Sequence, residues 1–293
     1  MTLVVGATGA LGFEVCTRLR ARGLPVRALV RGGSDREPAL AALGVEFVRG
    51  DLRDPASLEA ACSGVSRVIT TANAVVPRRD GDTLKSVDLD GHLSLVRVAD
   101  LAGIEHFVYT SVSSEANPRA VLVRYKRRVE RAVRESGMEW TILQPAAFME
   151  TWFSPAAGWD LVEGRVRLIG PGTVKSNPVS MCDVAEFTAL AAARDDLRRR
   201  VIPIGGPDIV TALEAVRLFE DVLDRKIVVK HVPAAVIRLA SRFLRPFNPA
   251  LSSLMALAAG TGEDEVIDMA LVLAEVPVEL TPLGNYILKD HSA

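Results

Sequence analysis

Short apolar runs alternate with stretches of helical periodicity over the first half of the chain. Residues 3–5 form an apolar run typical of a buried parallel strand, and Leu11, Val15 and Leu19 then recur at the spacing of one helix face. Strands alternating with helices in this way indicate an α/β fold, namely a doubly wound parallel sheet with helices on both faces. Further strands are predicted over residues 26–30, 45–48, 67–71, 106–110 and 140–143.

Capping residues mark where several of the intervening helices begin and end. Asp54 is a suitable N-cap, and Pro55 suits the first helical position. Helices over 84–102 and 125–136 are each followed by a glycine, the residue that most readily ends a helix. The six predicted strands and their helices therefore indicate a Rossmann-like sheet.

The pattern changes after Gln144-Pro145, where aromatic residues precede shorter elements. Strands are predicted over 165–169, 201–204 and 227–229, helices over 183–193 and 211–223, and a mainly helical final segment. We therefore expect a first domain over residues 1–147, to which segments 179–204 and 227–230 add short strands. A smaller, mainly helical lobe is expected over residues 148–293.

Three glycines lie where the first strand turns into the first helix. Gly6 would permit the tight turn, Gly9 would let the backbone approach a pyrophosphate, and Gly12 would allow close helix packing. The helix N-terminus offers its unpaired N–H groups to an anion. The alternative is an ordinary glycine-rich turn, because the spacing is one residue longer than the common Gly-x-Gly-x-x-Gly fingerprint. We interpret the turn as a dinucleotide-phosphate site.

Residues that follow the strands are the next candidates, because ligands of such sheets bind beyond the carboxyl ends of the strands. Arg31 follows the second strand, where an arginine accommodates the 2′-phosphate of NADP. The alternative for Arg31 is a surface side chain that stacks on adenine or extends into solvent. Asp51 follows the third strand and could bind the adenine amino group or stabilise a turn as an Asx motif. Arg31 favours NADP(H) over NAD(H).

Lys126 shares an apolar helix stripe with Leu122, Val129 and Val133. Burying an ammonium group without a partner is costly, so the side chain either extends to solvent or meets a polar ligand. We expect the ligand, namely the hydroxyls of the nicotinamide ribose. Lys126 is also the candidate for a catalytic residue, and no other catalytic residue is assigned.

Composition and charge narrow the class of protein. The chain has 293 residues, of which 49% are hydrophobic, and a formal net charge of -1, so we expect a globular protein without a nucleic-acid or membrane partner. The basic run over 124–131 is expected to be a solvated helix face. Cys16, Cys62 and Cys182 are far apart, which fits reduced thiols in the cytoplasm. We expect no signal peptide, no membrane span and no metal site.

Motifs over 4–12, 27–31, 50–54 and 107–111, taken together and in register, resemble the NmrA-like family of atypical short-chain dehydrogenases/reductases. The resemblance continues through the segments 126–130, 136–150 and 178–185 and weakens beyond about residue 235. It implies an NAD(P)-binding Rossmann domain over 1–147 and a substrate-binding lobe over 148–293.

The resemblance and the residues that follow the strands together imply two sets of site residues. The cofactor set is Gly6, Ala7, Thr8, Gly9, Ala10, Leu11, Gly12, Arg31, Asp51, Leu52, Thr71, Ala72, Asn73, Ser111, Lys126 and Pro145. The substrate-pocket set is Ser113, Ala146, Phe148, Met149 and Trp152. For the aromatic residues of the second set, the alternative is that they join the two lobes as core.

One departure from the superfamily bears on the reaction. The superfamily uses Tyr-x-x-x-Lys, but Leu122 stands four residues before Lys126, and Tyr125 points about 100° away on a helix. This disfavours alcohol–ketone chemistry and favours an NADPH-dependent reductase of an apolar quinone, dye or enone. The first alternative is a non-enzymatic NADP(H)-sensing regulatory protein that acts through a protein partner. The second is an assembly factor that uses the fold as a scaffold. We expect a monomer or a homodimer.

Overall fold

The computed structural model describes residues 1–75, 79–260 and 263–291, and the chain divides into two compact units. Unit 1 comprises Met1–Val112, Leu122–Gln144 and Val184–Ile202, and unit 2 comprises Ser113–Val121, Pro145–Asp183 and Pro203–Ala293. From the sequence, a boundary after residue 147 was expected, with segments 179–204 and 227–230 adding short strands to the first domain. In the structure the chain passes between the units several times. The reason is that most of helix α7 (Met181–Ala193) and strand β10 (Arg200–Ile204) belong with the sheet of unit 1 although they come late in the chain.

A seven-stranded sheet in the order β10-β6-β5-β4-β1-β2-β3 forms the centre of unit 1. The first six strands are β1 (Thr2–Val5), β2 (Val26–Val30), β3 (Glu46–Arg49), β4 (Arg67–Thr70), β5 (His106–Thr110) and β6 (Glu139–Pro145). The neighbouring pairs among them are parallel. The chain runs from β1 outward to β3 and then returns to the other side of β1 with β4, which confirms the doubly wound sheet. The carboxyl ends of β1 and β4 therefore flank the crevice in which such folds bind ligands.

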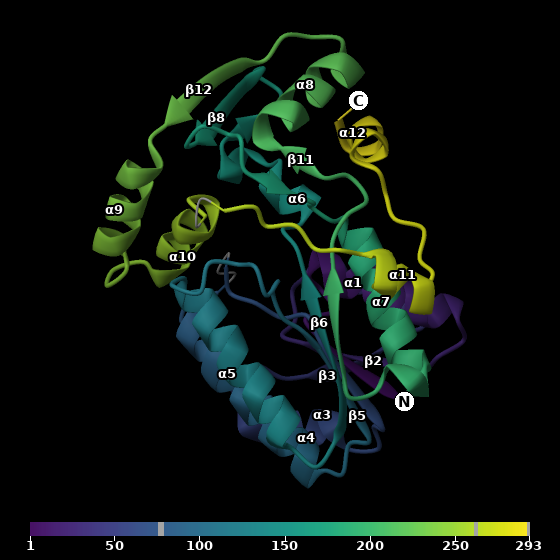
Figure 1. Cartoon of the computed structure of the whole chain (residues 1–293). Helices are drawn as coiled ribbons and strands as arrows, with labels where there is room; N and C mark the ends of the chain where they lie inside the picture. Colours follow the sequence, from purple (N-terminus) through teal and green to yellow (C-terminus); the bar gives the residue numbers. More distant parts are fainter. Residues whose placement is uncertain (76–78, 261–262, 292–293) are drawn as a thin grey trace. The chain divides into compact units, whose positions relative to one another are not determined.

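Helices cover both faces of this sheet. Figure 1 shows α3 (Pro55–Cys62), α4 (His92–Leu101) and α5 (Val121–Glu135) on one face, and α1 (Ala10–Ala21) and α7 on the other. A short helix, α2 (Glu37–Ala42), precedes β3. The Asp54 side chain caps α3 as predicted, accepting a hydrogen bond from the Ala56 N–H at 3.2 Å.

The helix predicted over 84–102 differs from the expectation in its first half. Residues Leu84–Gly91 form a π-helical segment, η1, and α4 follows it directly. Thr83 and Ser86 form a capping box at its start, which secures the backbone N–H groups there. A π-helix is rare and often accompanies a functional site. Here it carries Asp88 into the interior of unit 1.

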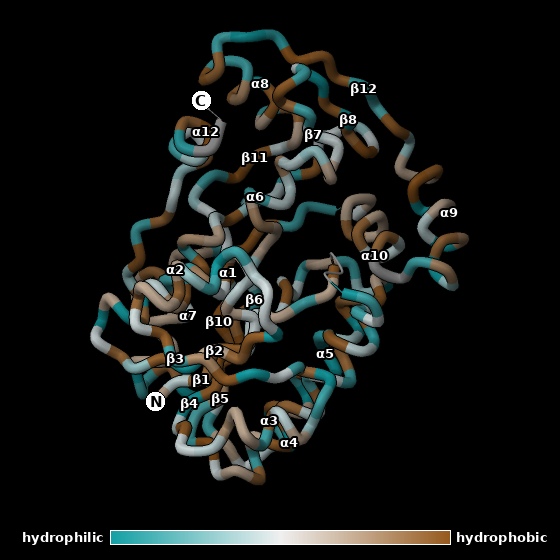
Figure 2. Tube along the Cα trace, turned by 180° about the vertical axis from the view of Figure 1, so that it is seen from behind, coloured by the Kyte–Doolittle hydropathy of each residue, from teal (hydrophilic) through white to brown (hydrophobic). Residues whose placement is uncertain are grey.

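Apolar side chains from the strands and the covering helices form the core of unit 1. Leu3, Phe107 and Tyr109 from the strands pack with Leu58 of α3 and Leu95 of α4, and all five are fully buried. In Figure 2 the strands of the sheet are predominantly brown, the colour of apolar residues. Burying one such side chain contributes about 1.5–3 kcal/mol, so this core supplies the rigid support for the residues at the strand ends.

Unit 2 contains a three-stranded sheet in the order β12-β8-β7 and a two-stranded sheet of β11 and β9. The bounds are β7 (Trp159–Asp160), β8 (Arg165–Ile169), β9 (Lys175–Ser176), β11 (Val210–Thr211) and β12 (Val228–Val232). The segment 227–230 was expected to extend the main sheet, but β12 instead pairs in parallel with β8. On β8, buried Val166 and Leu168 alternate with exposed Arg165 and Arg167. Such one-sided strands suit a small sheet with a solvent-facing side.

Helices and an aromatic cluster complete unit 2. The helices are α6 (Met149–Trp152), α8 (Ala212–Leu223), α9 (Ala234–Leu244), α10 (Pro249–Ala258), α11 (Ala270–Glu275) and α12 (Leu283–His291), with 3-10 turns at Pro155–Ala157 and, in unit 1, at Asp195–Leu197. Phe153 packs edge-to-face on Trp159 and Phe219 with ring centroids 4.9 and 5.3 Å away. Within the described ranges, every helix is too short or too polar to cross a lipid bilayer.

Candidate cofactor site

The turn between β1 and α1 leaves no space for side chains at two of its three glycines. A Cβ atom on Gly12 would lie 2.2 Å from the carbonyl oxygen of Gly6, and one on Gly6 would lie 2.8 Å from the backbone nitrogen of Ala72. Gly6 also has a φ of +91°, which L side chains rarely adopt. The Gly9 N–H donates to the Gly6 carbonyl at 2.9 Å. The loop is therefore closed tightly against the segment that follows β4.

The N-terminus of α1 opens directly from this turn. Gly9 is its N-cap and provides no side-chain hydrogen bond, and the first turn contains no acidic residue. The first N–H groups of a helix have no partner within the helix, and they carry the positive end of the helix dipole. Arg36 adds a guanidinium group, because its Nη1 donates to the Thr8 carbonyl at 3.2 Å and its Cζ lies 5.9 Å from the centre of the Phe13 ring. This set of donors fits a pyrophosphate.

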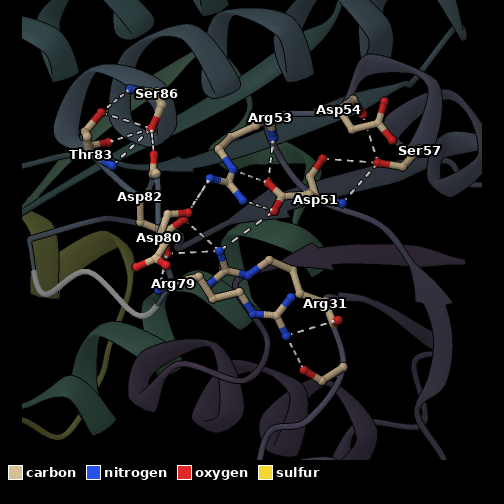
Figure 3. Close-up of polar contacts among 12 residues, drawn as sticks. Arg31, Asp51, Arg53, Asp54, Ser57, Arg79, Asp80, Asp82, Thr83 and Ser86 are labelled. Atoms are coloured by element: carbon tan, nitrogen blue, oxygen red, sulfur yellow. Dashed lines mark hydrogen bonds and ion pairs between the residues drawn. The ribbon is translucent and has the colours of Figure 1, made fainter.

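Arg31 belongs to an ion-pair network at the ends of β2 and β3 (Figure 3). Its Nη1 atom donates to both carboxylate oxygens of Asp82 at 2.8 and 3.0 Å and lies 3.8 Å from Asp51 Oδ2. The Asp82 side chain is 4% exposed, so its charge is held away from water and is compensated by Arg31 and Arg53. The network places the Arg31 guanidinium beyond the strand end, and its contact with a 2′-phosphate stays a prediction.

Asp51 forms an Asx turn, which was one of the two roles predicted for it from the sequence. Its Oδ1 atom accepts a hydrogen bond from the Arg53 N–H at 2.9 Å, which is the Asx pattern. The Arg53 guanidinium also binds both carboxylate oxygens, at 2.9 and 2.7 Å. The hydrogen bond from the Arg53 side chain is the largest of the effects that hold the Asp51 pKa below its usual value. Asp51 is therefore an ionised acceptor at the strand end, and its role toward adenine stays a prediction.

Sequence reasoning missed Arg79, which reaches the same strand end from a distant segment. Its Nη2 atom donates to the carbonyl oxygens of Arg31, at 3.1 Å, and of Gly32, and its backbone N–H donates to Asp82 at 3.1 Å. Arg79 follows no predicted strand directly, so the rule that selected Arg31 could not select it. The adjacent arginines at positions 78 and 79 of the sequence were the available signal.

Lys126 turns inward from α5 rather than extending to solvent. Its side chain is 7% exposed, and its Nζ atom donates to the Thr110 carbonyl, at the end of β5, at 3.1 Å. The same atom lies 3.8 Å from Asp88 Oδ1 and 5.1 Å from the centre of the Tyr109 ring. The lysine thus sits beside the carboxyl ends of β4 and β5, where its role as a ribose ligand stays a prediction.

Asp88 and His92 complete this buried cluster, and sequence reasoning had not selected either. Burial raises the pKa of Asp88, an effect that the Lys126 charge opposes, and burial lowers the pKa of Lys126. Asp88 Oδ2 accepts from the Ala74 N–H at 2.9 Å, whereas Oδ1 is buried and has no hydrogen bond in the described structure. Burial, followed by the Lys126 charge, lowers the pKa of His92 to about 3, so its ring is neutral. The signal for Asp88 was a carboxylate placed between the apolar residues Val87 and Leu89.

The tautomer of His92 follows from its two neighbours. Its Nδ1 atom lies 2.8 Å from the Val87 carbonyl, which can only accept, so we assign the proton to Nδ1. Nε2 then accepts from the Thr70 hydroxyl at 3.0 Å. His92 is therefore a fully bonded interior residue that holds η1 against the end of β4.

Leu122 occupies the position where the Tyr-x-x-x-Lys motif has its tyrosine, and neither Tyr109 nor Tyr125 replaces that phenol. Tyr109 is buried, its hydroxyl has no hydrogen bond among the described residues, and burial raises its pKa well above the usual value. Tyr125 precedes Lys126 on α5 and is only partly buried, whereas Leu122 is buried. The cluster can hold a polar group through Lys126, but it supplies no tyrosine of ordinary acidity.

The remaining cofactor candidates of unit 1 are engaged by the backbone or by neighbouring polar groups. The Thr71 N–H donates to the Val5 carbonyl at 3.0 Å, and Asn73 Oδ1 accepts from the Val75 N–H at 3.2 Å. The Ser111 hydroxyl donates to Glu130, which also accepts from Gln144 at 3.0 Å. Ala7, Leu11 and Leu52 are buried. These contacts place the candidates at one end of the sheet.

Unit 2 contains Pro145 and the residues predicted for the substrate pocket. The Ser113 N–H donates to the Pro145 carbonyl at 2.9 Å, and Ala146 donates from its N–H to the Ile204 carbonyl at 2.8 Å. Met149 is fully buried in the aromatic core, and Trp152 packs against that core. Phe148 is partly exposed just before α6. Met149 thus lies in the core of unit 2, while the substrate pocket itself stays a prediction.

The described ranges contain no group of three or more His, Cys, Asp or Glu residues that could hold a metal ion. Cys16 and Cys62 are buried free thiols, and burial raises their pKa values to about 12 and about 11. They are therefore protonated and unreactive at neutral pH.

Comparisons with known proteins bear on the family and the fold of the chain. The chain is 31% identical to the photosystem II assembly factor Ycf39 of Synechocystis sp. over 97% of its own length and 89% of that protein. It is 30% identical to the NAD(P)H azoreductase of Xenophilus azovorans over 73% of this chain and 71% of that protein. Its fold matches the crystal structure of Citrobacter sp. triphenylmethane reductase complexed with NADP(H), with a TM-score of 0.78, 22% identity and 99% of both chains covered. The model of the NmrA-like family matches residues 1–287, so the chain belongs to the NmrA-like family.

Proposed function

We propose that this chain is an NAD(P)H-dependent reductase of an apolar acceptor such as a quinone, a dye or a conjugated enone, with NADP(H) preferred. The observation that carries the proposal is the β1–α1 turn, where Gly12 and Gly6 pack too closely for any side chain and α1 begins without a side-chain capping hydrogen bond. Support comes from a relative named as an azoreductase and from a structural neighbour solved with NADP(H).

Each part of the proposed site has a separate task. The glycine turn and the N-terminus of α1 would hold the pyrophosphate, because the first N–H groups of a helix have no partner within the helix and can donate to an anion. Arg31 would contact the 2′-phosphate, and Lys126 would donate to the ribose hydroxyls from its buried position. A reduced nicotinamide supplies a hydride when it is bound. The residues named here bind and orient that group.

The absence of a tyrosine four residues before Lys126 limits the acceptor. A ketone needs a proton at its oxygen as the hydride arrives, and a lysine-activated phenol provides that proton in the superfamily. In a quinone or an enone, conjugation spreads the negative charge that the hydride adds. In a cationic dye, the hydride cancels the positive charge. Water can then supply any proton that is needed, so the proposed reaction requires no tyrosine beside Lys126.

Two measurements test the proposal. Calorimetric titration of the full chain should show NADP binding about ten- to a hundredfold more tightly than NAD, because the 2′-phosphate contact is charge-assisted. A panel of quinones, triarylmethane dyes and enones should include one that oxidises NADPH with a KM between about 1 μM and 1 mM. Phe148→Ala should change the KM for that acceptor more than the affinity for NADP. Lys126→Ala should weaken cofactor binding.

A non-catalytic role is the second candidate, and the similarity to an assembly factor over nearly the whole chain favours it. Such a protein would bind NADP(H) and act through a protein partner. The two roles differ in one result. If no acceptor in the panel oxidises NADPH while NADP binds tightly and changes the proteolysis of unit 2, the non-catalytic role replaces the reductase. Failure of both NADP and NAD to bind would reject both roles.

A further inference from the structure

An exposed apolar stripe runs along α9 in unit 2. Val236, Leu239 and Phe243 are all exposed, and Phe247, just beyond the helix, is 86% exposed. At about 100° per residue, the three helical residues fall within about 60° of one another on the helix surface. Exposed apolar residues that occur singly need no explanation, but a contiguous stripe on one helix indicates an interaction surface.

The opposite side of α9 already has its packing partner. Ile237 and Leu244 are partly buried and Ser241 is buried, and the Ser241 carbonyl accepts a hydrogen bond from the Ser252 hydroxyl of α10 at 2.8 Å. These residues lie on the face toward α10. The exposed stripe is therefore a second apolar face of a helix whose first apolar face is already packed.

Arginines border this stripe. Arg238, Arg242 and Arg245 are exposed and lie within about 60° of one another, on the flank next to Leu239. Along α9 in Figure 2, brown apolar positions alternate with teal polar ones. A helix with exposed apolar residues beside basic ones is the pattern of a helix that lies in a membrane interface.

The charge of the surrounding sequence selects the kind of partner. Residues 225–262 contain no Asp or Glu, although the whole chain has a net charge of -1. Their cationic residues are Arg225, Lys226, Lys230, Arg238, Arg242 and Arg245. Lys230 lies on β12 and is exposed, as is Arg167, its partner in register on β8. Lys226 lies 3.8 Å from Glu220 Oε2, whereas the stretch that contains α9 has no acidic residue of its own. Such a basic stretch complements a uniformly anionic plane better than a protein surface of mixed charge.

We propose that α9 and its flanks dock the protein on an anionic lipid bilayer. Leu239 and Phe243 enter the boundary between headgroups and acyl chains, while Arg238, Arg242 and Arg245 contact lipid phosphates. This binding is peripheral and reversible, because a single interfacial helix buries little apolar area. It departs from the expectation of no membrane partner, which rested on the net charge of the whole chain and not on its distribution.

Vesicle sedimentation of the full chain tests the proposal. The protein should sediment with vesicles of 70% phosphatidylcholine and 30% phosphatidylglycerol, remain in solution with pure phosphatidylcholine, and be released by 0.5 M salt. The triple variant R238Q/R242Q/R245Q should lower the partition coefficient about 100-fold. The double variant L239S/F243S should lower it about tenfold or more, since both side chains are exposed and their replacement leaves the core unchanged.

Two matched controls separate this surface from nonspecific attraction. R124Q/R128Q/R131Q removes the same number of charges from the exposed basic face of α5, and L271S removes an exposed leucine from α11. Both should partition within about threefold of the unchanged protein.

Several results would overturn the proposal. These are no preference for anionic vesicles, equal loss of binding in the α5 control, or unchanged binding of both α9 variants. A dimer in lipid-free solution that L239S/F243S dissociates would assign the stripe to contact between copies of the chain instead. NADP titration of the same variants keeps this result separate from the proposed function, because neither variant changes a residue of the cofactor site.

Discussion

Lys126 Nζ lies 3.8 Å from Asp88 Oδ1, and the two side chains are 7% and 0% exposed. Desolvation disfavours both charges, while each charge stabilises the other. Neither residue can therefore be changed alone without leaving its partner as an unpaired buried group. The pair links η1 to α5 at the end of the sheet where the cofactor is proposed to bind.

Replacing Asp88 with Asn should destabilise the protein by about 3–5 kcal/mol, because it leaves the Lys126 ammonium buried without the charge of its ion-pair partner. The Asn oxygen can still accept the Ala74 N–H, so the loss reports on charge. Urea unfolding at pH 7.5 measures it. The matched control is Asp90→Asn, which breaks an exposed pair with Lys85 on the same helical segment and should cost less than about 1 kcal/mol. Equal effects of the two changes would show that the buried pair is not held as charges.

Arg31→Ala should reduce NADP affinity by about ten- to a hundredfold and leave NAD affinity nearly unchanged, since only NADP carries the 2′-phosphate. Calorimetric titration with both dinucleotides measures the ratio. Arg53→Ala is the control, because Arg53 belongs to the same network through Asp51 and is not assigned to the phosphate. If the preference survives in Arg31→Ala and disappears in Arg79→Ala, the phosphate contact belongs to Arg79.

Gly12→Ala should abolish tight cofactor binding and cost about 1–3 kcal/mol of stability, because the new methyl group would meet the Gly6 carbonyl at 2.2 Å. The matched control is Gly284→Ala in α12, where a Cβ atom meets nothing within 4 Å. That change should stabilise the protein by about 0.5–1 kcal/mol. Thermal unfolding with and without NADP distinguishes the two. A Gly12→Ala protein that binds NADP normally would contradict the assignment of the turn.

His92 and His106 should each lower the stability of the fold as the pH drops from 6.5 toward 4, while Glu265, whose pKa burial raises to about 7, acts in the opposite direction. Burial lowers the pKa values of His92 to about 3 and of His106 to about 4, from 6.5 in an unfolded chain. Below pH 6.5 the unfolded state binds protons that the native state does not, so each histidine removes up to about 1.4 kcal/mol per pH unit. The loss of stability due to each histidine ends once the pH falls below the pKa of that histidine in the folded state. Urea unfolding between pH 7.5 and 5 measures this slope, and His106→Gln should reduce it. An identical slope in that variant would contradict the assignment to His106.

The sequence alone determined the elements whose signals are local. The glycine turn is predictable from residues 1–21 alone, because a strand, a glycine that permits a positive φ and the start of a helix follow one another there. Asp54 and Pro55 likewise predict the start of α3 by themselves. The alternation of strands and helices then restricts the topology to a doubly wound sheet, since parallel strands need crossovers.

Only the tertiary structure decided which distant residues meet. Asp82 reaches Arg31 across 51 positions, and Asp88 reaches Lys126 from another helix, because parallel pairing of β4 with β1 and β5 brings those strand ends together. The π-helical turn of η1 has no signal in the apolar pattern, which favours an ordinary helix. β12 paired with β8 instead of the main sheet, because side-chain alternation predicts a strand and one buried face but not which strand will lie beside it.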